Sequence, residues 1–213
     1  MIIALIGSPG SGKGTYAQML AQEGWVHFSM GQALRDHVKK KGPLSKKIDS
    51  YTSNGRLVPS SIFFRVFKDA VQGFGKKNLV LDGLPRTIRQ ATGMEKSLAS
   101  IHPIDAFLFI DVHVDEVKDR LSKRSQCGDC GMVYGKSAAP KKKGICGRCG
   151  GRLSIRKDDT PSVIDERFHV YEKETLPVIE WASKRYLLFH INGHGKPGVV
   201  FKRIRTVIRL VKG

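Results

Sequence analysis

The chain has 213 residues, of which 40% are hydrophobic and 26% are charged, so it can bury a full core, and collagen-like, fibrous and disordered classes are excluded. Its 37 Lys and Arg against 19 Asp and Glu give a net charge of +18, which indicates a polyanionic ligand such as a nucleotide, a nucleic acid or an anionic lipid. The basic residues are dispersed along the chain, which favours a solvated basic surface over a single nucleic-acid-binding stripe.

No stretch approaches the roughly 20 consecutive apolar residues that a membrane span requires. The apolar run from Met1 to Ile6 is too short for a signal peptide and follows no basic residues, so we interpret it as a buried first strand. The sequence therefore predicts a soluble, cytoplasmic protein without a membrane partner.

Short apolar runs alternate with helical patterns along the chain. We expect strands over residues 1–6, 25–29, 78–81, 104–112 and 187–191, and helices over residues 15–21, 31–41, 62–72, 114–124, 160–182 and 199–211. Continuous apolar runs separated by helices are typical of a parallel sheet covered on both faces. The predicted fold class is therefore α/β, with three layers (α/β/α) around a central parallel five-stranded sheet.

Two segments interrupt this alternation. Gly42 and Pro43 break a basic helical stretch, and the chain from there to Pro59 reads as a small peripheral insert. Between Ser125 and about Asp159 the composition changes to Gly, Cys, Lys and Pro with little periodicity, apart from short pieces such as residues 132–134. We interpret this second segment as another insert.

A glycine-rich loop follows the first strand directly. Residues 7–15 read GSPGSGKGT and satisfy the pattern G-x-x-x-x-G-K between a strand and a helix, the context that a phosphate-binding loop (P-loop) requires. The glycines let backbone N–H groups converge on phosphate oxygens, and the positive end of the next helix points at them. Lys13 adds a mobile charge toward the β- and γ-phosphates. Gly14 stands where most such loops have the Mg²⁺-binding Ser or Thr, so Thr15 comes one position late.

The four cysteines of the chain form two C-x-x-C pairs, Cys127 with Cys130 and Cys146 with Cys149, fifteen residues apart. This spacing is typical of a zinc site with four thiolate ligands. Disulfides are the alternative, but a cytosolic chain keeps its thiols reduced. Because four thiolates saturate tetrahedral zinc, we expect a structural ion that stiffens the second insert.

Several further stretches occur in a characteristic order along almost the whole chain. They are HFSMGQALR (27–35), GRLVP (55–59), LDGLPRT (81–87), Arg120 and Arg124, then RKDD (156–159) and Arg167. With the loop GSPGSGKGT, they make the chain resemble the nucleoside monophosphate kinases, and the adenylate kinases in particular. The resemblance implies reversible Mg²⁺-dependent phosphoryl transfer, ATP + AMP = 2 ADP, which maintains the balance of adenine nucleotides.

The resemblance also implies a domain organisation. Residues 1–28, 61–122 and 161–213 would form the P-loop core. Residues 29–60, here called the acceptor insert, would cover the monophosphate, and residues 123–160, here called the lid, would carry the zinc and cover ATP. It further implies a monomer with ATP and AMP as partners and no specific nucleic acid.

Site residues follow from the same motif positions. Phosphoryl transfer needs in-line positioning, neutralisation of charge and exclusion of water, and arginine forks bind phosphate oxygens while staying charged near pH 7. The residues implied for catalysis are Lys13, Asp82, Arg86, Arg124, Arg156 and Arg167. Those implied for ATP are Gly10, Ser11, Gly12, Lys13, Gly14, Thr15, Arg120, Arg124, Val133, Tyr134 and Lys196. Those implied for AMP are Met30, Arg35, Arg56, Leu57, Val58, Gly83, Arg86, Gln90, Arg156 and Arg167.

Three of these residues have more particular roles by resemblance. Asp82 ends an apolar strand and would hold Mg²⁺ through waters, at the edge where ligand sites gather in open α/β sheets. Arg120 would lie flat on the adenine of ATP. Gln90 would read the edge of the acceptor adenine with its amide.

The chain departs from the family pattern at three positions. Met30 and Gln32 stand where the family commonly has Thr and Asp, so the choice of acceptor base is less firmly implied than the reaction. Gly195 is an extra residue before Lys196, in the loop expected to touch the adenine of ATP.

Two other functions remain open from the sequence. The nearer one is a kinase for UMP, CMP or GMP, or an AMP kinase that uses GTP. The more distant one is a nucleic-acid-associated P-loop protein, suggested by the net charge and by the four-cysteine insert. Against it, aromatic residues are not clustered near the lysines, and Asp82 lacks the following acidic residue typical of ATP-hydrolysing motors.

Overall fold

The computed structural model describes residues 1–71, 73–75, 77–99, 102–135, 140 and 142–213. Gln72, the predicted end of the helix that begins at Ile62, lies outside these residues, as does part of the lid between residues 135 and 142. Within the described chain, no helix combines the length and the apolar character that a membrane span needs.

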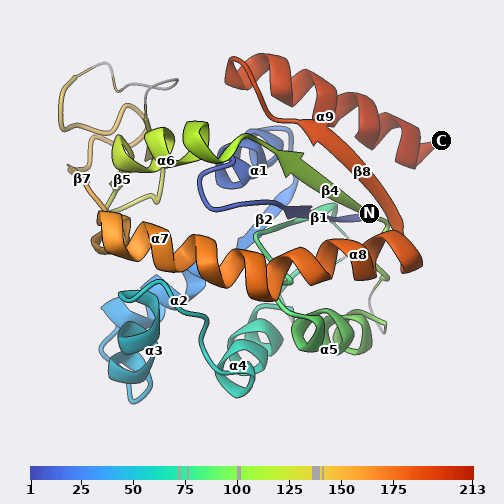
Figure 1. Ribbon diagram of the computed structural model, residues 1–213, viewed down its shortest axis with the longest axis horizontal. Coiled ribbons are helices and arrows are strands. Elements are labelled where there is room, and N and C mark those ends of the chain that lie inside the picture. The colour runs from blue at the N-terminus through green and yellow to red at the C-terminus, as the bar shows by residue number, and fades with distance from the viewer. Residues whose placement is uncertain (72, 76, 100–101, 136–139, 141) are drawn as a thin grey trace.

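The main sheet has the five parallel strands that the apolar runs predict. They are β1 (Ile2–Ile6), β2 (Val26–Ser29), β3 (Leu79–Asp82), β4 (Ala106–Asp111) and β8 (Leu187–Asn192). Their spatial order is β2-β3-β1-β4-β8, and every neighbouring pair is parallel. The carboxyl ends of the strands therefore meet at one edge of the sheet, where the glycine loop follows β1 (Figure 1).

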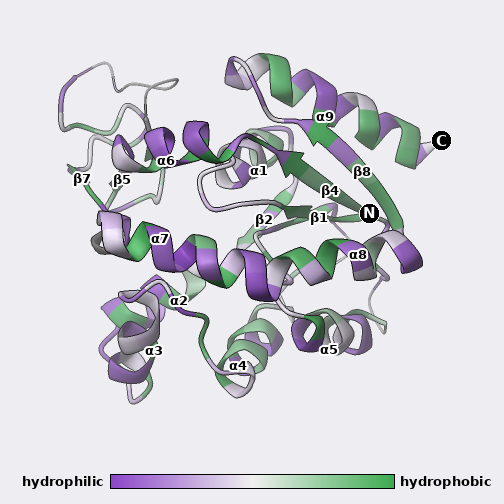
Figure 2. Cartoon of the chain, viewed as in Figure 1, coloured by the Kyte–Doolittle hydropathy of each residue, from purple (hydrophilic) through white to green (hydrophobic). Residues whose placement is uncertain are grey.

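Helices cover both faces of this sheet and define two hydrophobic clusters. Alternate residues of β1 enter different clusters, because successive side chains of a strand point to opposite faces. Ile3 and Leu5 pack with α1 (Lys13–Gln22), α6 (Val114–Ser122), α7 (Pro161–Val170) and α9 (Pro197–Lys212). Ala4 and Ile6 pack with α4 (Ser60–Val71), α5 (Ile88–Leu98) and α8 (Leu176–Arg185). Figure 2 shows the resulting hydrophobic strands between helices with mixed faces. The α/β/α prediction is confirmed.

One predicted helix, residues 160–182, changes its helical geometry part of the way along. It consists of α7, a π-helical segment (Tyr171–Thr175) and α8, which follow one another without a break in the ribbon (Figure 1). Pro177 has no backbone N–H to donate to the preceding turn, and a wider turn just before a proline is a common way to absorb that loss. The helical periodicity alone does not carry this detail.

The two inserts have secondary structure of their own. The acceptor insert contains α2 (Met30–Lys39) and α3 (Ser45–Thr52). The lid contains a small antiparallel sheet of order β6-β5-β7, formed by β5 (Ser125–Cys127), β6 (Val133–Tyr134) and β7 (Leu153–Ser154), and ends in a 3₁₀ turn (Lys157–Asp159). Sequence periodicity did not predict the helices α3 and α5, the lid strands β5 and β7 or the 3₁₀ turn.

Candidate active site

The glycine loop wraps around the side chain of Lys13. Its Nζ donates hydrogen bonds to the carbonyl oxygens of Gly7 (2.9 Å) and Ser8 (2.7 Å) and to Oγ of Ser11 (3.2 Å). Gly10 has φ +84°, and a Cβ there would lie 2.8 Å from the carbonyl oxygen of Val117, so only glycine lets the loop pass this close to α6. The loop is therefore closed on itself, with its lysine ammonium at the edge of the sheet.

Gly14 opens space for a carboxylate. A Cβ at this position would lie 3.3 Å from Oδ2 of Asp82, so a Ser or Thr side chain there would crowd the end of β3. Oδ2 of Asp82 also contacts Nε2 of His27 at 3.2 Å. Burial acts to raise the pKa of Asp82, but the hydrogen bond and charge of His27 and the charge of Lys13 together lower it. Asp82 is thus an ionised carboxylate beside the phosphate loop.

A single cleft of about 560 Å³ runs from the loop to the acceptor insert and the lid. All seven arginines that the sequence assigned to nucleotide binding line it: Arg35, Arg56, Arg86, Arg120, Arg124, Arg156 and Arg167. They come from α2, the loop after α3, the loop after β3, α6, the lid and α7. Residues more than a hundred positions apart in the chain are therefore brought together around one cavity.

Several of these guanidinium groups lie deep in the protein. Burial, followed by the charge of Arg167, lowers the pKa of Arg86, and burial likewise comes first in lowering the pKa values of Arg156 and Arg167. A guanidinium keeps its charge near neutral pH nonetheless. Within the described chain, Nε of Arg35 is buried without a hydrogen-bond partner. The cleft therefore holds an excess of confined positive charge, which a phosphate chain would relieve.

Asp159 orders two of the arginines, and the sequence reasoning assigned it no role. Its side chain is fully buried. One of its oxygens accepts from Nε of Arg124 at 2.7 Å, and the other accepts from a terminal nitrogen of Arg167 at 2.8 Å. The sequence feature that could have indicated this role is the pair of aspartates between Arg156 and Arg167, because a cluster of arginines needs carboxylates to orient the guanidinium groups.

The lid and the acceptor insert contact each other through amides. Gln126 of the lid accepts a hydrogen bond from Arg156 at 2.5 Å and donates one to Oε1 of Gln32 at 3.1 Å. Lys39 of α2 donates to the carbonyl oxygen of Gly128 at 2.6 Å. Gln32, which replaces the usual aspartate, thus reaches the lid arginine through Gln126 rather than through an ion pair.

Most of the other predicted nucleotide contacts also lie on this cleft: Gly10, Gly12, Lys13, Gly14, Thr15, Met30, Leu57, Val58, Asp82, Gly83, Gln90, Val133 and Tyr134. Lys196 and Ser11 are not among its lining residues, although Gly195 and Pro197 are. Gln90 is buried rather than exposed, and its Oε1 accepts the backbone N–H of Arg86 at 2.8 Å. Tyr16 and Tyr171 line the cleft without having been predicted.

The four cysteines converge in the lid. Their sulfur atoms all lie within 4.8 Å of one another. The two close pairs are separated by 3.5 Å (Cys127 and Cys149) and 3.6 Å (Cys130 and Cys146), far beyond the roughly 2.05 Å of a disulfide bond, and all four are free thiols. Four soft ligands gathered this closely fit a metal ion, and the disulfide alternative is not supported.

The fold and the cleft together define a class. A glycine loop between a parallel strand and a helix, followed around one cavity by a lysine, seven arginines and a buried carboxylate, is the arrangement of a P-loop enzyme that acts on phosphate groups.

Comparison with known proteins narrows this class. The family model described as "Adenylate kinase" matches residues 5–186. The chain is 40% identical to an adenylate kinase of Methanothrix thermoacetophila and 37% identical to one of Clostridium tetani, each alignment covering 98% of both chains. It is 36% identical to an adenylate kinase of Thermosipho africanus over 98% of this chain and all of that one. The chain therefore belongs to the adenylate kinase family, and its activity is the transfer of a phosphoryl group between adenine nucleotides.

Proposed function

We propose that the cleft holds ATP and AMP end to end, with the phosphoryl group that moves between them lying beside Lys13. The observation that carries this proposal is the convergence of all seven arginines and the glycine loop on one cavity. Two nucleotides that meet at their phosphates bring a concentrated negative charge, and the guanidinium groups that line the cleft supply the matching positive charge.

On the donor side, the backbone of the loop and Lys13 bind the β- and γ-phosphates of ATP. Arg120 covers the adenine, since it lines the cleft and its guanidinium is held by Glu116 and by the carbonyl oxygen of Gly193. Val133 and Tyr134 of the lid close over the nucleotide. Gly195 and Pro197, which line the cleft, take the place that the sequence suggested for Lys196.

On the acceptor side, Arg35 and Arg86 bind the phosphate of AMP. The unpartnered Nε of Arg35 supports this, because an α-phosphate oxygen would satisfy it. Met30, Leu57 and Val58 surround the adenine, and Gln90 offers it the amide nitrogen that remains free when its oxygen is bonded to Arg86. Gly83 and Arg56 complete this wall.

Transfer itself depends on charge and position. Arg124, Arg156 and Arg167 surround the moving group, and Asp159 fixes the orientation of two of them. Mg²⁺, when bound with ATP, neutralises phosphate charge; Asp82 would hold it through water, since the glycine at position 14 leaves this carboxylate room beside the loop. Closing the lid and the acceptor insert excludes water that would otherwise hydrolyse ATP.

The inserts act as two covers on a core formed by residues 1–28, 61–122 and 161–213. Zn²⁺ bound by the four thiolates would give the lid (residues 123–160) a stable shape. The proposed action as a monomer follows from the family resemblance, and four reduced thiols fit the cytoplasm.

An acceptor screen tests the proposal. Purified protein with ATP and Mg²⁺ is mixed in turn with AMP, CMP, UMP and GMP, and diphosphate formation is followed by a coupled assay. We expect AMP to be the best acceptor. Higher turnover with another monophosphate would show that this nucleotide, and not AMP, is the acceptor. Met30 lines the cleft where the family commonly has threonine, so the choice of base is the part of the proposal that the screen tests most sharply. A screen in which no acceptor reacts would refute the proposal.

A further inference from the structure

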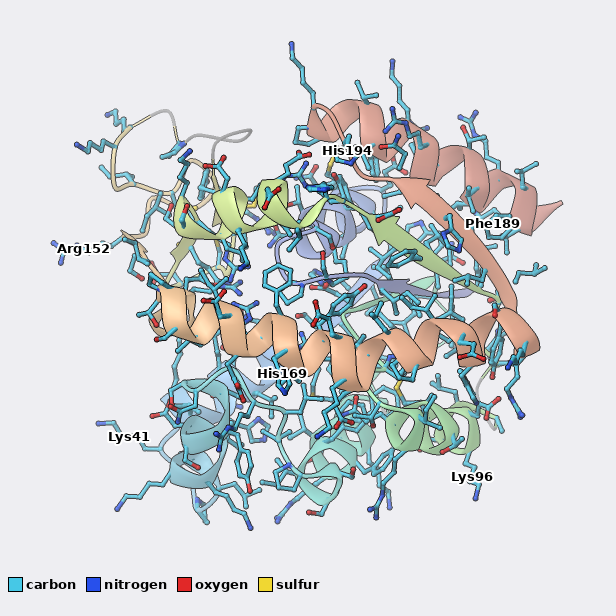
Figure 3. The ribbon with its side chains drawn as sticks, viewed as in Figure 1. Lys41, Lys96, Arg152, His169, Phe189 and His194 are labelled. Atoms are coloured by element: carbon cyan, nitrogen blue, oxygen red, sulfur yellow. The ribbon has the colours of Figure 1, made fainter. Side chains whose placement is uncertain are left out.

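The loop between β8 and α9 is tied down by side chains from three directions. Arg203 of α9 donates hydrogen bonds to the carbonyl oxygens of Asn192 (2.6 Å) and His194 (2.9 Å). The side-chain oxygen of Asn192 accepts the backbone N–H of His194 at 2.9 Å. The third direction is α6, because Nδ1 of the His194 ring contacts Oε2 of Glu116 at 2.5 Å. Figure 3 shows His194 between α6 and α9.

Glu116 joins this loop to the donor side of the cleft. One of its oxygens faces the His194 ring, and the other accepts a hydrogen bond from the guanidinium of Arg120, one helical turn further along α6. The same guanidinium donates to the carbonyl oxygen of Gly193 at 3.1 Å. Arg120, Glu116 and the loop therefore form a closed ring of contacts.

Beyond His194 the loop has little support. Gly195 adopts φ +108°, and a Cβ on it would meet no atom within 4 Å. Yet Gly195 and Pro197 line the cleft, as Arg120 does. His194, held at its ring by Glu116 and at its carbonyl oxygen by Arg203, thus anchors the loop just before the part that lines the cleft.

We propose that His194 is a positioning residue for the base of the donor nucleotide: through Glu116 it orients the guanidinium of Arg120, and it holds the adjoining loop as a wall of the base site. This rests on the proposed placement of ATP against Arg120. A carboxylate held at both oxygens cannot swing away from the arginine, whereas one held at a single oxygen can.

The size of the effect is set by exposure. The side chains of His194 and Glu116 are 50% and 36% exposed, and an exposed ion pair contributes little, so loss of the contact corresponds to about a threefold to fivefold change in affinity. Because the contact lies on the base side of the donor, the change should appear in KM for ATP and not in kcat or in KM for AMP.

The test compares His194→Ala with His194→Asn. The amide nitrogen of asparagine occupies nearly the place of Nδ1 and can still donate to Glu116, so we expect the alanine variant to raise KM for ATP about threefold to fivefold and the asparagine variant to restore most of it. The matched control is His113→Ala, which removes another exposed histidine–carboxylate pair of the same helix, with Asp115 at 3.3 Å. His113 does not line the cleft, and its loss should leave KM for ATP unchanged.

The Glu116→Gln variant, alone and combined with His194→Ala, completes the design. If His194 acts through Glu116, the double variant should be no worse than the poorer single one. An unchanged KM for ATP in His194→Ala, beside a raised one in Arg120→Ala, would overturn the inference and leave the proposed function standing. If Arg120→Ala also bound ATP normally, the donor placement itself would be wrong. A loss of kcat with equal increases in both KM values would indicate a merely structural role.

Discussion

The core and the lid of this enzyme are held together by different forces. In the core, side chains such as Phe63, Phe67 and Phe107 are almost completely buried between the sheet and its helices, and each contributes roughly 1.5–3 kcal/mol by leaving water. In the described part of the lid, the buried hydrophobic cluster consists of Cys127, Tyr134 and Cys146, with Cys130, Met132 and Leu153 packed against it. A segment with so small a core needs a cross-link to keep its shape, and the four converging thiols are suited to bind one.

The comparison extends to what each region contributes to catalysis. The core supplies fixed charges: Lys13 on its loop, and Arg86 and Asp82 at the end of β3. The lid supplies Arg156 and the wall of Val133 and Tyr134, all of which line the cleft. Loss of a core charge should therefore alter the chemical step directly, whereas loss of the lid's cross-link should act through the shape and closure of the lid.

The largest effect is expected from Lys13→Ala or Arg86→Ala. Each removes a buried positive charge from the transfer site, so we predict a fall in kcat of about two to four orders of magnitude. Both variants should still fold, because these side chains line the cleft and belong to neither hydrophobic cluster of the core. Steady-state kinetics and thermal unfolding test both parts.

The control for this pair is Lys96→Ala, an exposed lysine on α5 (Figure 3). It should change neither kcat nor the unfolding temperature. Near-normal turnover in both Lys13→Ala and Arg86→Ala would contradict the assignment of the cleft.

The second effect concerns the lid alone. We predict one zinc ion per chain, and we expect Cys146→Ser or chelation to lower activity about tenfold or more while the core unfolds at nearly the same temperature. Limited proteolysis should then cut between residues 123 and 160 before it cuts elsewhere. Metal analysis that finds no zinc, or a core that unfolds together with the lid, would contradict the claim that a metal cross-link stabilises the lid independently of the core.

The same contrast explains what the sequence could predict. The strands and the glycine loop were predictable because burial on both faces and phosphate binding each restrict residue types at neighbouring positions. The two cysteine pairs were predictable because metal geometry restricts their spacing. In all these cases the physical constraint acts locally along the chain.

Contacts between distant segments were not predictable in this way. The two aspartates after Arg156 indicated a carboxylate in a basic site, but the sequence did not show that Asp159 would join Arg124 to Arg167. Nor did it show that Gln126 would link Arg156 to Gln32. The π-helical segment likewise depends on how one long helix accommodates Pro177 against the sheet. Such details follow from tertiary packing, which residue spacing does not encode.

The core should also differ from the lid in its response to pH, because Lys13 of the core titrates near neutral pH. Burial, opposed by the charge of Asp82, lowers the pKa of Lys13 to about 7. A bound triphosphate favours the ammonium and raises this pKa again toward its ordinary value. Between these two pKa values the ATP complex holds more protons than the free enzyme, so ATP binding should take up protons at pH 8 and weaken as pH rises, by at most about tenfold per pH unit.

Calorimetry at pH 8 in two buffers of different ionisation enthalpy measures this uptake. At pH 6 Lys13 is protonated with or without ATP, so its contribution should vanish. The matched variant is Lys13→Met, which keeps the length of the side chain without the titrating group and should abolish the difference between buffers. Equal uptake in the wild type and in Lys13→Met would show that another group is responsible.

The smallest effect is expected where the acceptor insert meets the core, at Met30. This side chain is buried and lines the cleft beside the proposed acceptor base, where the family commonly has threonine. Met30→Thr removes apolar length and adds a hydroxyl that can hydrogen-bond a base edge, so we expect the preference for AMP over CMP to change by about threefold to fivefold in kcat/KM. Met30→Leu keeps the apolar volume and should leave that ratio unaltered. If leucine and threonine shifted the ratio alike, loss of the flexible methionine side chain rather than gain of the hydroxyl would govern the choice of base.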